Sequence, residues 1–150
     1  MRTFSDAICD WLAEEGYTHC FFVAGGNIMH LLNSARTRFK CIPVVHEVTA
    51  GISAEYFNEI SGADGEKAFA LVTAGPGLTN LMTAIAGAQI ESRALLILGG
   101  QVKSSDLSGG KVRQRGIQEI DGVEIVRSIC KVSKNLSSPI KKVDFLQLEK

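Results

Sequence analysis

The 150-residue sequence lacks any apolar run close to the roughly 20 residues that a membrane-spanning helix needs. Its first six residues do not form the apolar core of a signal peptide. Neither sign of charge is in excess, since 16 basic residues balance 16 acidic ones. A net charge of zero argues against partners attracted by bulk charge, such as nucleic acids and anionic membranes. We therefore expect neither a nucleic-acid nor a membrane partner.

Cysteine is scarce and scattered along the chain. The four cysteines are Cys9, Cys20, Cys41 and Cys130, and their spacing matches no metal-binding or redox motif. We therefore predict no metal site in this chain. Widely separated, reduced thiols are typical of a cytoplasmic protein, which is the location that we expect.

Short apolar runs alternate with amphipathic segments of helical period along most of the chain. Such alternation predicts one α/β domain over residues 1–150, with a doubly wound, mostly parallel sheet and helices on both faces. Ser5 and Asn27 are predicted N-caps, and Gly16 is a predicted helix stop. The predicted helices cover residues 4–12, 28–35, 48–60, 78–86, 121–126 and 143–148, and the predicted strands cover residues 19–23, 42–46, 68–73, 94–99 and 129–132.

The segment 101–118 interrupts this alternation. It contains three glycines and four basic residues and almost nothing apolar. Loops of this length are either functional or disordered. We predict a mobile surface loop over residues 101–118.

Polar and glycine-rich turns follow the predicted strands, at the carboxyl edge where parallel sheets bind ligands. Gly25-Gly26-Asn27 follows the first strand and could hold a phosphate at a helix N-terminus. The segment lacks the dinucleotide fingerprint and the P-loop pattern, so a simple tight turn is the favoured interpretation.

Glu47 follows the second predicted strand and precedes small residues that leave its carboxylate accessible. One interpretation is a functional carboxylate at the ligand-binding edge. The other is a helix-start glutamate that complements the helix dipole, and the spacing alone leaves both open. We expect the neighbouring His46 to be a hydrogen-bonded histidine of the core.

The turn after the third strand reads Thr73-Ala74-Gly75-Pro76-Gly77, with Asn80 one helical turn further on. Pro76 fits the first turn of a helix. The glycines expose backbone groups to a ligand, and Asn80 could face that ligand. An ordinary crossover turn would also need glycine.

Together, these motifs resemble a known family. Val44-Val45-His46-Glu47 with Ala50, the 73–77 turn with Asn80, and Gln118-Glu119 resemble the pyrimidine-binding domain of thiamin diphosphate enzymes, above all the large subunit of acetolactate synthase and its homologues. The resemblance extends from about residue 8 to residue 133. It implies the thiamin diphosphate-binding fold and a 2-oxo acid substrate.

The resemblance also implies roles for individual residues. Glu47 would be the catalytic residue, which contacts the aminopyrimidine N1′ of the cofactor and promotes the tautomer that deprotonates the thiazolium ring. Gln118 would face the substrate channel. The residues implied to lie near the pyrimidine are Gly25, Glu47, Thr73, Pro76, Gly77 and Asn80.

Members of this family hold the diphosphate and its Mg²⁺ on a second domain with a Gly-Asp-Gly motif, which this sequence lacks. We therefore expect a domain that is inactive alone, either the N-terminal part of a longer enzyme or one subunit of a split enzyme. FAD in the complete enzyme is compatible with the resemblance. The expected partners are a diphosphate-binding domain and a second copy, because the helix that begins near Leu78 is apolar over much of its circumference. The alternative is a non-catalytic α/β module for association or regulation.

Overall fold

A computed structural model describes residues 2–61 and 65–149. Its sheet has four strands in the order β2-β1-β3-β4, and every neighbouring pair is parallel. The strands are β1 (Tyr17–Phe22), β2 (Lys40–Pro43), β3 (Lys67–Val72) and β4 (Leu96–Gly99). The helices are α1 (Phe4–Glu14), α2 (Met29–Ala35), α3 (Glu47–Ser61), α4 (Pro76–Asn80), α5 (Met82–Ile90), α6 (Gly122–Val126) and α7 (Lys142–Glu149), and the short 3₁₀ turns are η1 (Gly26–Ile28), η3 (Ser104–Asp106) and η4 (Arg127–Ile129).

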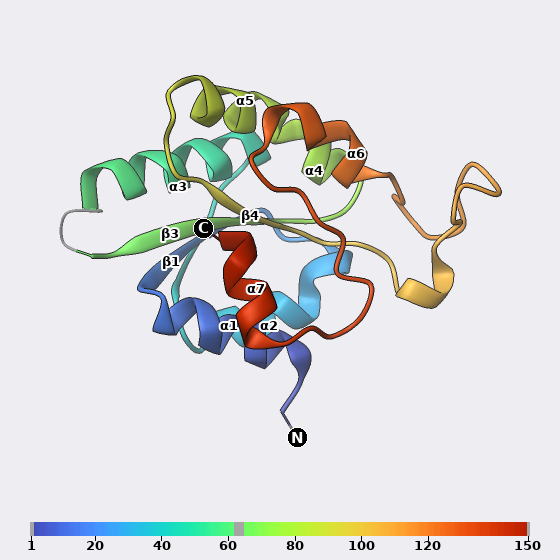
Figure 1. The fold of residues 1–150 in the computed structure, drawn as a ribbon, viewed down its shortest axis with the longest axis horizontal. Helices are drawn as coiled ribbons and strands as arrows, with labels where there is room; N and C mark the ends of the chain where they lie inside the picture. Colours follow the sequence, from blue (N-terminus) through green and yellow to red (C-terminus); the bar gives the residue numbers. More distant parts are fainter. Residues whose placement is uncertain (1, 62–64, 150) are drawn as a thin grey trace.

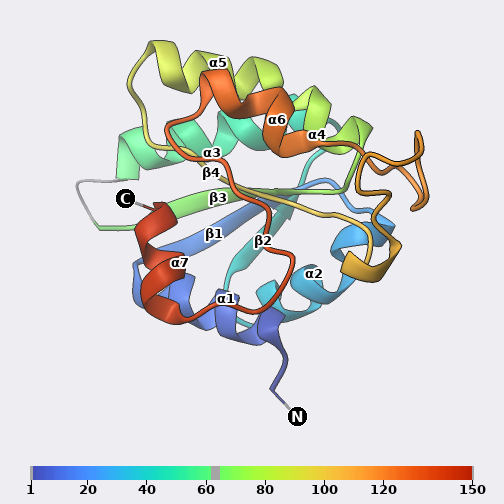
Figure 2. The same cartoon turned by 45° about the vertical axis from the view of Figure 1, so that its right-hand side comes forward.

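Helices cover both faces of the sheet, so the chain forms three layers (Figure 1). α1, α2 and α7 lie against one face, and α3, α4, α5 and α6 lie against the other (Figure 2). This arrangement confirms the predicted doubly wound α/β fold. Among the described residues, no helix is both long enough and apolar enough to cross a membrane.

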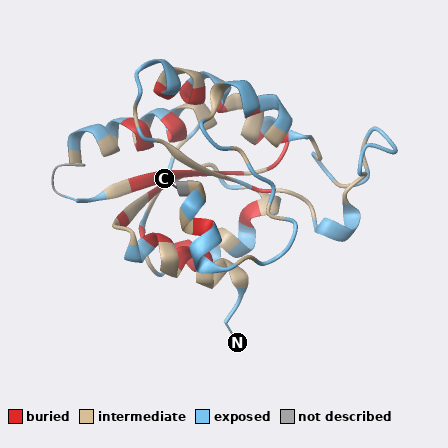
Figure 3. Ribbon diagram, viewed as in Figure 1, coloured by how far each residue is buried: buried red, intermediate tan, exposed pale blue. Residues whose placement is uncertain are grey.

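β3 is one of the two inner strands of the sheet and the most buried strand (Figure 3). Its side chains alternate between the faces, as the two-residue period of a strand requires. Phe69 and Leu71 pack with α1 and α2, whereas Ala68, Ala70 and Val72 face α3 and α5. Because both faces are covered, the strand is apolar at successive positions rather than at alternate ones.

The two faces of β3 differ in side-chain size, and the small residues lie towards α3. Ala50 and Ala54 of α3 pack against Ala68 and Ala70 of β3, and all four are fully buried. On the next face of α3, Gly51 lies so close to α5 that an added Cβ would be 2.5 Å from Ala84 Cβ. Small side chains thus let α3 approach both the sheet and α5.

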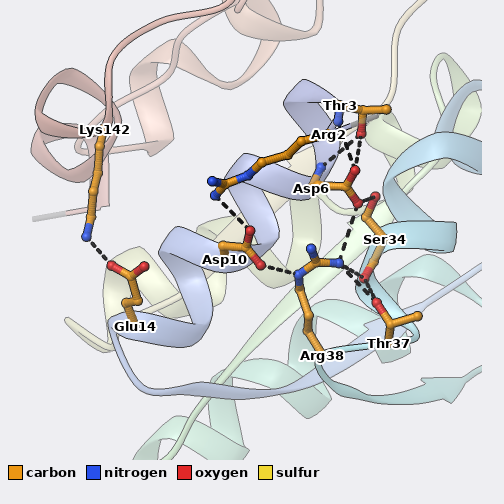
Figure 4. Close-up of polar contacts among 9 residues, drawn as sticks. All are labelled: Arg2, Thr3, Asp6, Asp10, Glu14, Ser34, Thr37, Arg38 and Lys142. Atoms are coloured by element: carbon orange, nitrogen blue, oxygen red, sulfur yellow. Dashed lines mark hydrogen bonds and ion pairs between the residues drawn. The ribbon is translucent and has the colours of Figure 1, made fainter.

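A network of charged and hydroxyl side chains ties α1 to α2 and to α7 (Figure 4). Thr3 and Asp6 form a capping box at the start of α1, and the Ser34 hydroxyl donates to Asp6 at 2.8 Å. The Thr3 backbone N–H is the largest cause that lowers the pKa of Asp6 to about 2. Arg38, just after the end of α2, forms an ion pair with Asp10 of α1. The residues that join α1 to α7 are Trp11 with Phe145, whose ring centroids are 5.6 Å apart, and Glu14 with Lys142, an ion pair.

The predicted strands and helices are confirmed with shifted ends, apart from one strand and one helix. The helix predicted at residues 78–86 is divided at Leu81 into α4 and α5. The predicted fifth strand at residues 129–132 is wrong, because the chain there forms the end of η4 and pairs with no strand in the described part of the sheet. The second strand ends at Pro43 rather than at residue 46, since Val45 is 99% exposed and cannot belong to a buried strand.

Two predicted N-caps are also wrong. Thr3, not Ser5, caps α1, because Asp6 is placed to complete the reciprocal capping box. The side chain of Asn27 makes no capping hydrogen bond to η1 or α2. The predicted helix stop at Gly16 is confirmed by its φ of +89°, in the left-handed region that favours glycine.

Two glycines in the interiors of α3 and α5 form a matched pair for a stability test. Alanine at either site gains about 0.5–1 kcal/mol of helix propensity. At Gly51 the new methyl would meet Ala84, and overpacking of this kind costs about 1–3 kcal/mol, so we expect Gly51→Ala to lower the free energy of unfolding. At Gly87 nothing lies within 4 Å, so Gly87→Ala should raise it. Urea unfolding of both variants measures the two changes, and a stabilised Gly51→Ala would contradict the close packing of α3 on α5.

Candidate functional site

The carboxyl ends of the four strands converge on one edge of the sheet, as in other parallel sheets. The segment after β1 meets the segment after β3, where Asn27 Oδ1 and Thr73 Oγ1 are 3.3 Å apart. The segment after β4 joins both, because the Gly100 N–H donates to Val72 O at 2.8 Å and an added Cβ on Gly100 would lie 2.8 Å from Asn27 O. This edge is therefore a continuous surface of loop backbone.

Glu47 is the first residue of α3, at the end of the segment that follows β2, and its side chain is half-buried. The amide of Asn80, at the end of α4, donates to Glu47 Oε2 at 2.8 Å. The other oxygen, Oε1, has no hydrogen bond to any other described residue, and it lies 3.6 Å from where a Cβ on Gly77 would be. One carboxylate oxygen is thus held in place while the other remains available.

His46 does not lie in the core, so that prediction is wrong. Its side chain is exposed, and its Nδ1 accepts a hydrogen bond from the Val48 N–H at 3.2 Å. The ring therefore satisfies a free N–H in the first turn of α3. This contact helps to fix the start of the helix, and with it the position of Glu47.

Thr73 is surrounded by glycines because larger residues would not fit. An added Cβ on Gly25 would lie 2.4 Å from Thr73 Cβ, and one on Gly77 would lie 2.8 Å from Thr73 Cγ2. Both distances are shorter than real carbon contacts allow. The backbone at Gly25 and at Gly77 therefore packs directly against the side chain of Thr73. Gly77 lies between Thr73 and Glu47.

The end of the long loop lies against the turn after β3. Gly75 has a φ of +62°, and an added Cβ there would be 2.7 Å from the carbonyl oxygen of Gln118. Gln118 itself has a φ of +60°, a strained value for a residue other than glycine. Strain of this kind concentrates at functional sites. The contact places Gln118, which is exposed, beside the Thr73–Gly77 turn.

The structure brings most of the predicted site residues together. Contacts link Gly25, Thr73, Gly77, Glu47 and Asn80 into one chain of neighbours, and Gln118 joins through Gly75. The remaining residue, Pro76, is the exposed first residue of α4, where proline was predicted. Their roles towards a ligand stay predictions.

Two contributors to this edge were not predicted as site residues. Asn27 contacts Thr73 instead of capping a helix, and Gly75 supplies the close approach to Gln118. The sequence signal for both was the position of a glycine-rich turn directly after a buried strand.

Glu119 organises the loop that precedes it. Its Oε1 accepts from the Ser108 N–H at 2.6 Å, and its Oε2 accepts from the N–H groups of Arg115 and Gly116 at 2.9 and 3.1 Å. These bonds, above all that from Arg115, lower the pKa of Glu119 from 4.5 to about 2. The mobility predicted for residues 101–118 stays a prediction, with these hydrogen bonds as the contacts that oppose it.

A cavity of about 1300 Å³ lies beside this edge and is not centred on it. It opens along β4 and the segment 129–136, and it reaches the edge at Asn27, Leu78 and Gly100, whereas Glu47, Thr73 and Asn80 do not line it. Glu47 is therefore half-buried at this edge and does not line that cavity. No group of three or more histidine, cysteine or acidic side chains within residues 2–61 and 65–149 could hold a metal ion.

An accessible carboxylate oxygen beside a glycine can hold or share a proton with a ring nitrogen of a flat ligand. Comparison with known proteins identifies the class. Residues 2–125 match the family described as thiamine pyrophosphate enzyme, N-terminal TPP binding domain. The chain belongs to this family, and the resemblance inferred from its motifs is confirmed.

The particular relatives fall into two groups. The 2-hydroxyacyl-CoA lyase 2 of Xenopus laevis is 35% identical over 130 residues, which is 85% of this chain and 19% of that protein. The human 2-hydroxyacyl-CoA lyase 2 is 34% identical over 122 residues, 80% of this chain and 18% of that protein. The acetolactate synthase large subunit IlvG of Mycobacterium tuberculosis is 30% identical over 128 residues, 85% of this chain and 22% of the relative. This chain thus spans about a fifth of the length of these relatives.

The hydrogen bonds of Glu119 predict how the loop responds to charge and pH. Glu119→Gln keeps the size of the side chain but offers one acceptor oxygen instead of two charged ones, so trypsin should cut after Lys111, Arg113 and Arg115 several-fold faster at pH 7. Because the folded-state pKa is depressed, the loop order is present above about pH 4.5 and is lost as the pH falls towards 2. NMR shifts of the Ser108, Arg115 and Gly116 amides follow this loss.

The control for this measurement is Glu124→Gln, which removes an exposed carboxylate that pairs with Arg127 on the neighbouring turn. We expect no change in cleavage of the loop in this variant. Equal cleavage rates for wild type and Glu119→Gln would mean that Glu119 does not order the loop.

Proposed function

We propose that this chain is the cofactor-activating, aminopyrimidine-binding domain of an enzyme that uses thiamin diphosphate. The observation that carries the proposal is the geometry of Glu47. Asn80 holds one carboxylate oxygen at 2.8 Å, and the other stays accessible beside Gly77. Membership of the family of TPP-binding N-terminal domains supports the same assignment.

The residues fit the cofactor that the family implies. A flat aminopyrimidine ring needs an open approach to a carboxylate, and the absence of a side chain at Gly77 leaves space beside Glu47 Oε1. Thr73 stays half-buried at the same place because Gly25 and Gly77 make room for it. Gln118 is exposed at the far end of the turn, in a position suited to the substrate channel.

Each side chain then has a definable task. Asn80 orients the carboxylate through Oε2, so Glu47 presents Oε1 in one direction. Oε1 exchanges a proton with a ring nitrogen of the aminopyrimidine, which is general acid–base work that a positioned carboxylate performs. The glycines at 25 and 77 let the ring approach the backbone. When bound, thiamin diphosphate supplies the carbon nucleophile that attacks a substrate carbonyl.

We propose two candidate substrate classes for the complete enzyme. The motif resemblance and the relative named acetolactate synthase support a 2-oxo acid decarboxylase or ligase. The relatives named 2-hydroxyacyl-CoA lyase 2 support a lyase acting on a 2-hydroxyacyl thioester as the second candidate. Assays with both substrate classes distinguish them.

Catalysis is proposed to need more than this chain. The relatives are about five times longer, and the described residues contain no cluster that could hold a metal ion. We propose that another domain, from the same or another chain, holds the diphosphate and its Mg²⁺, and that the domain described here is inactive alone.

A cytoplasmic location is supported by the four cysteines, which are all free thiols. A non-catalytic association or regulatory module is the alternative, and the Glu47–Asn80 pair argues against it.

Glu47→Gln tests the proposal directly. Glutamine keeps an oxygen that can accept from Asn80, so the melting temperature should not change, but an amide cannot take up the proton. General acid–base contributions are about 10²–10⁴-fold, and we expect turnover to fall by at least that factor. The measurement is turnover of 2-oxo acids and of 2-hydroxyacyl thioesters by the complete enzyme, with thiamin diphosphate and magnesium present.

Glu59→Gln is the matched control, since Glu59 is an exposed carboxylate on the same helix, 3.8 Å from the Arg93 guanidinium. This variant should keep wild-type turnover. Turnover close to normal in Glu47→Gln would overturn the proposed role of Glu47 and favour the non-catalytic module.

We further propose that the domain pairs with a second copy through α3 and α5. The apolar face predicted for this purpose is mostly buried within the chain, because Leu81 and Ile85 pack under α3 and α6. The outer sides of the two helices nevertheless expose Ile52 (40%), Tyr56 (48%) and Ile90 (79%). A groove between the two helices is lined by Ile52 and Tyr56 of α3 and by Gly87 of α5. Exposed apolar surface of this kind is typical of interfaces.

Sedimentation at micromolar concentration tests this pairing. Wild type should sediment as a dimer, and Ile52→Glu should shift it towards monomer by placing a charge in the interface. Val143→Glu is the control, since Val143 is also an exposed apolar residue (59%), on α7 against the opposite face of the sheet. A wild-type protein that sediments only as a monomer would rule out the pairing.

A further inference from the structure

Two cysteines that are 21 positions apart in the sequence are direct neighbours in the sheet. Cys20 of β1 and Cys41 of β2 are register partners in the parallel ladder. Partners on adjacent strands are about 4.7–4.9 Å apart. A disulfide requires Cα atoms about 4.4–6.8 Å apart, so the register itself satisfies that requirement. Both side chains lie on the same face of the sheet, in the core beneath α1 and α2.

The two thiols have different environments. Cys20 is fully buried, whereas Cys41 lies on the edge strand and is partly exposed. The side chains of Cys20 and Cys41 interact with each other. This interaction lowers the pKa of Cys41, and together with burial it raises the pKa of Cys20. Cys41 is thus the accessible member of the pair and the one favoured as a thiolate.

The other two cysteines lack this combination. Cys9 of α1 is buried, and burial raises its pKa to about 12. Cys130 is partly exposed like Cys41, but burial raises its pKa and it packs in a separate cluster with Val126 and Leu78. Reactivity of cysteine depends on the thiolate and on access, so Cys41 is the favoured site of attack.

We propose that Cys20 and Cys41 form a peroxide-sensitive dithiol pair, with Cys41 as the reacting thiol and Cys20 as the resolving thiol. In the first step the Cys41 thiolate attacks hydrogen peroxide: an S–O bond forms, the O–O bond breaks, and hydroxide leaves. In the second step the Cys20 sulfur attacks the sulfenic acid: the S–S bond forms, the S–O bond breaks, and the hydroxyl leaves as water with the Cys20 proton. The pair loses two electrons and peroxide is reduced to water.

The pair is connected to the candidate site through β2. Cys41 is the second residue of β2, and the segment after this strand leads directly to Glu47 at the start of α3. β2 is an edge strand whose single ladder neighbour is β1. A disulfide would therefore join the edge strand covalently to the centre of the sheet, one short segment before Glu47.

Intact-mass spectrometry of the folded chain, before and after treatment with hydrogen peroxide, tests the pair. We expect a loss of about 2 Da, for two hydrogen atoms, that dithiothreitol reverses. Digestion with trypsin and a glutamyl protease separates the peptides of Cys9, Cys20 and Cys41. The expected product joins the peptides of Cys20 and Cys41, and a bridge that maps to Cys9 would overturn the proposal.

Variants assign the two roles. In Cys20→Ala the sulfenic acid has no resolving thiol, so dimedone should label Cys41, and the 2 Da loss should disappear. Cys41→Ala should also abolish the 2 Da loss. Because Cys41 is partly exposed, this variant still tests the pair if the buried Cys20→Ala variant does not fold. Cys130→Ala is the matched control and should behave as wild type. A wild-type chain that keeps its mass, or that is oxidised at Cys130 alone, would contradict the proposal.

Discussion

Close packing of small residues between α3, β3 and α5 is the constraint on which the candidate site depends. Ala50 and Ala54 let α3 lie directly on Ala68 and Ala70 of β3, and Gly51 lets it lie equally close to α5. A helix held on two sides by methyl groups and a glycine has little freedom to slide or rotate. Its first residue, which bears the carboxylate, is thereby fixed relative to the end of β3.

The same packing explains how two motifs distant in sequence meet. The turn after β3 leads into α4, and α4 ends at Asn80, next to the start of α3. Because all strands are parallel, the turn and the carboxylate lie on the same edge of the sheet. The glycines of the turn then remove the side chains that would separate Thr73 from its neighbours. The site thus depends on the parallel direction of the strands, which brings both motifs to one edge, and on glycines that have no side chain to keep the motifs apart.

Sequence reasoning recovered the fold because periodicity is a strong local signal. Four of the five predicted strands exist, and so do the predicted helices, one of them divided into α4 and α5. It failed where the outcome depends on a partner elsewhere in the chain. The segment 129–132 is apolar enough for a strand but pairs with none, and Ser5 resembles a cap but has no reciprocal partner, unlike Thr3 with Asp6. His46 looked like a core residue because its strand was expected to continue past Pro43.

The candidate site shows the same division. The positions of Glu47, Thr73, Gly77 and Asn80 relative to the strands were predictable, because a strand end followed by a helix start is encoded locally. The pairing of Asn80 with one particular oxygen of Glu47 was not, since it depends on the angle at which α4 approaches α3. Likewise, nothing in the spacing of Cys20 and Cys41 indicates that they are register partners, which depends on strand order.

The half-buried position of Glu47 bears on the proposal that this domain acts only in an assembly. In the isolated chain, water can solvate the free oxygen, so the carboxylate costs little to maintain. When a second domain covers the edge, water is displaced and the effective dielectric falls, and every charge interaction of the carboxylate becomes stronger. A hydrogen bond from Asn80 that is already in place needs no reorganisation at that moment. The half-buried state of Glu47 thus costs the domain little, and in the proposed assembly the strongest interaction of its carboxylate would form only when the second domain covers the edge.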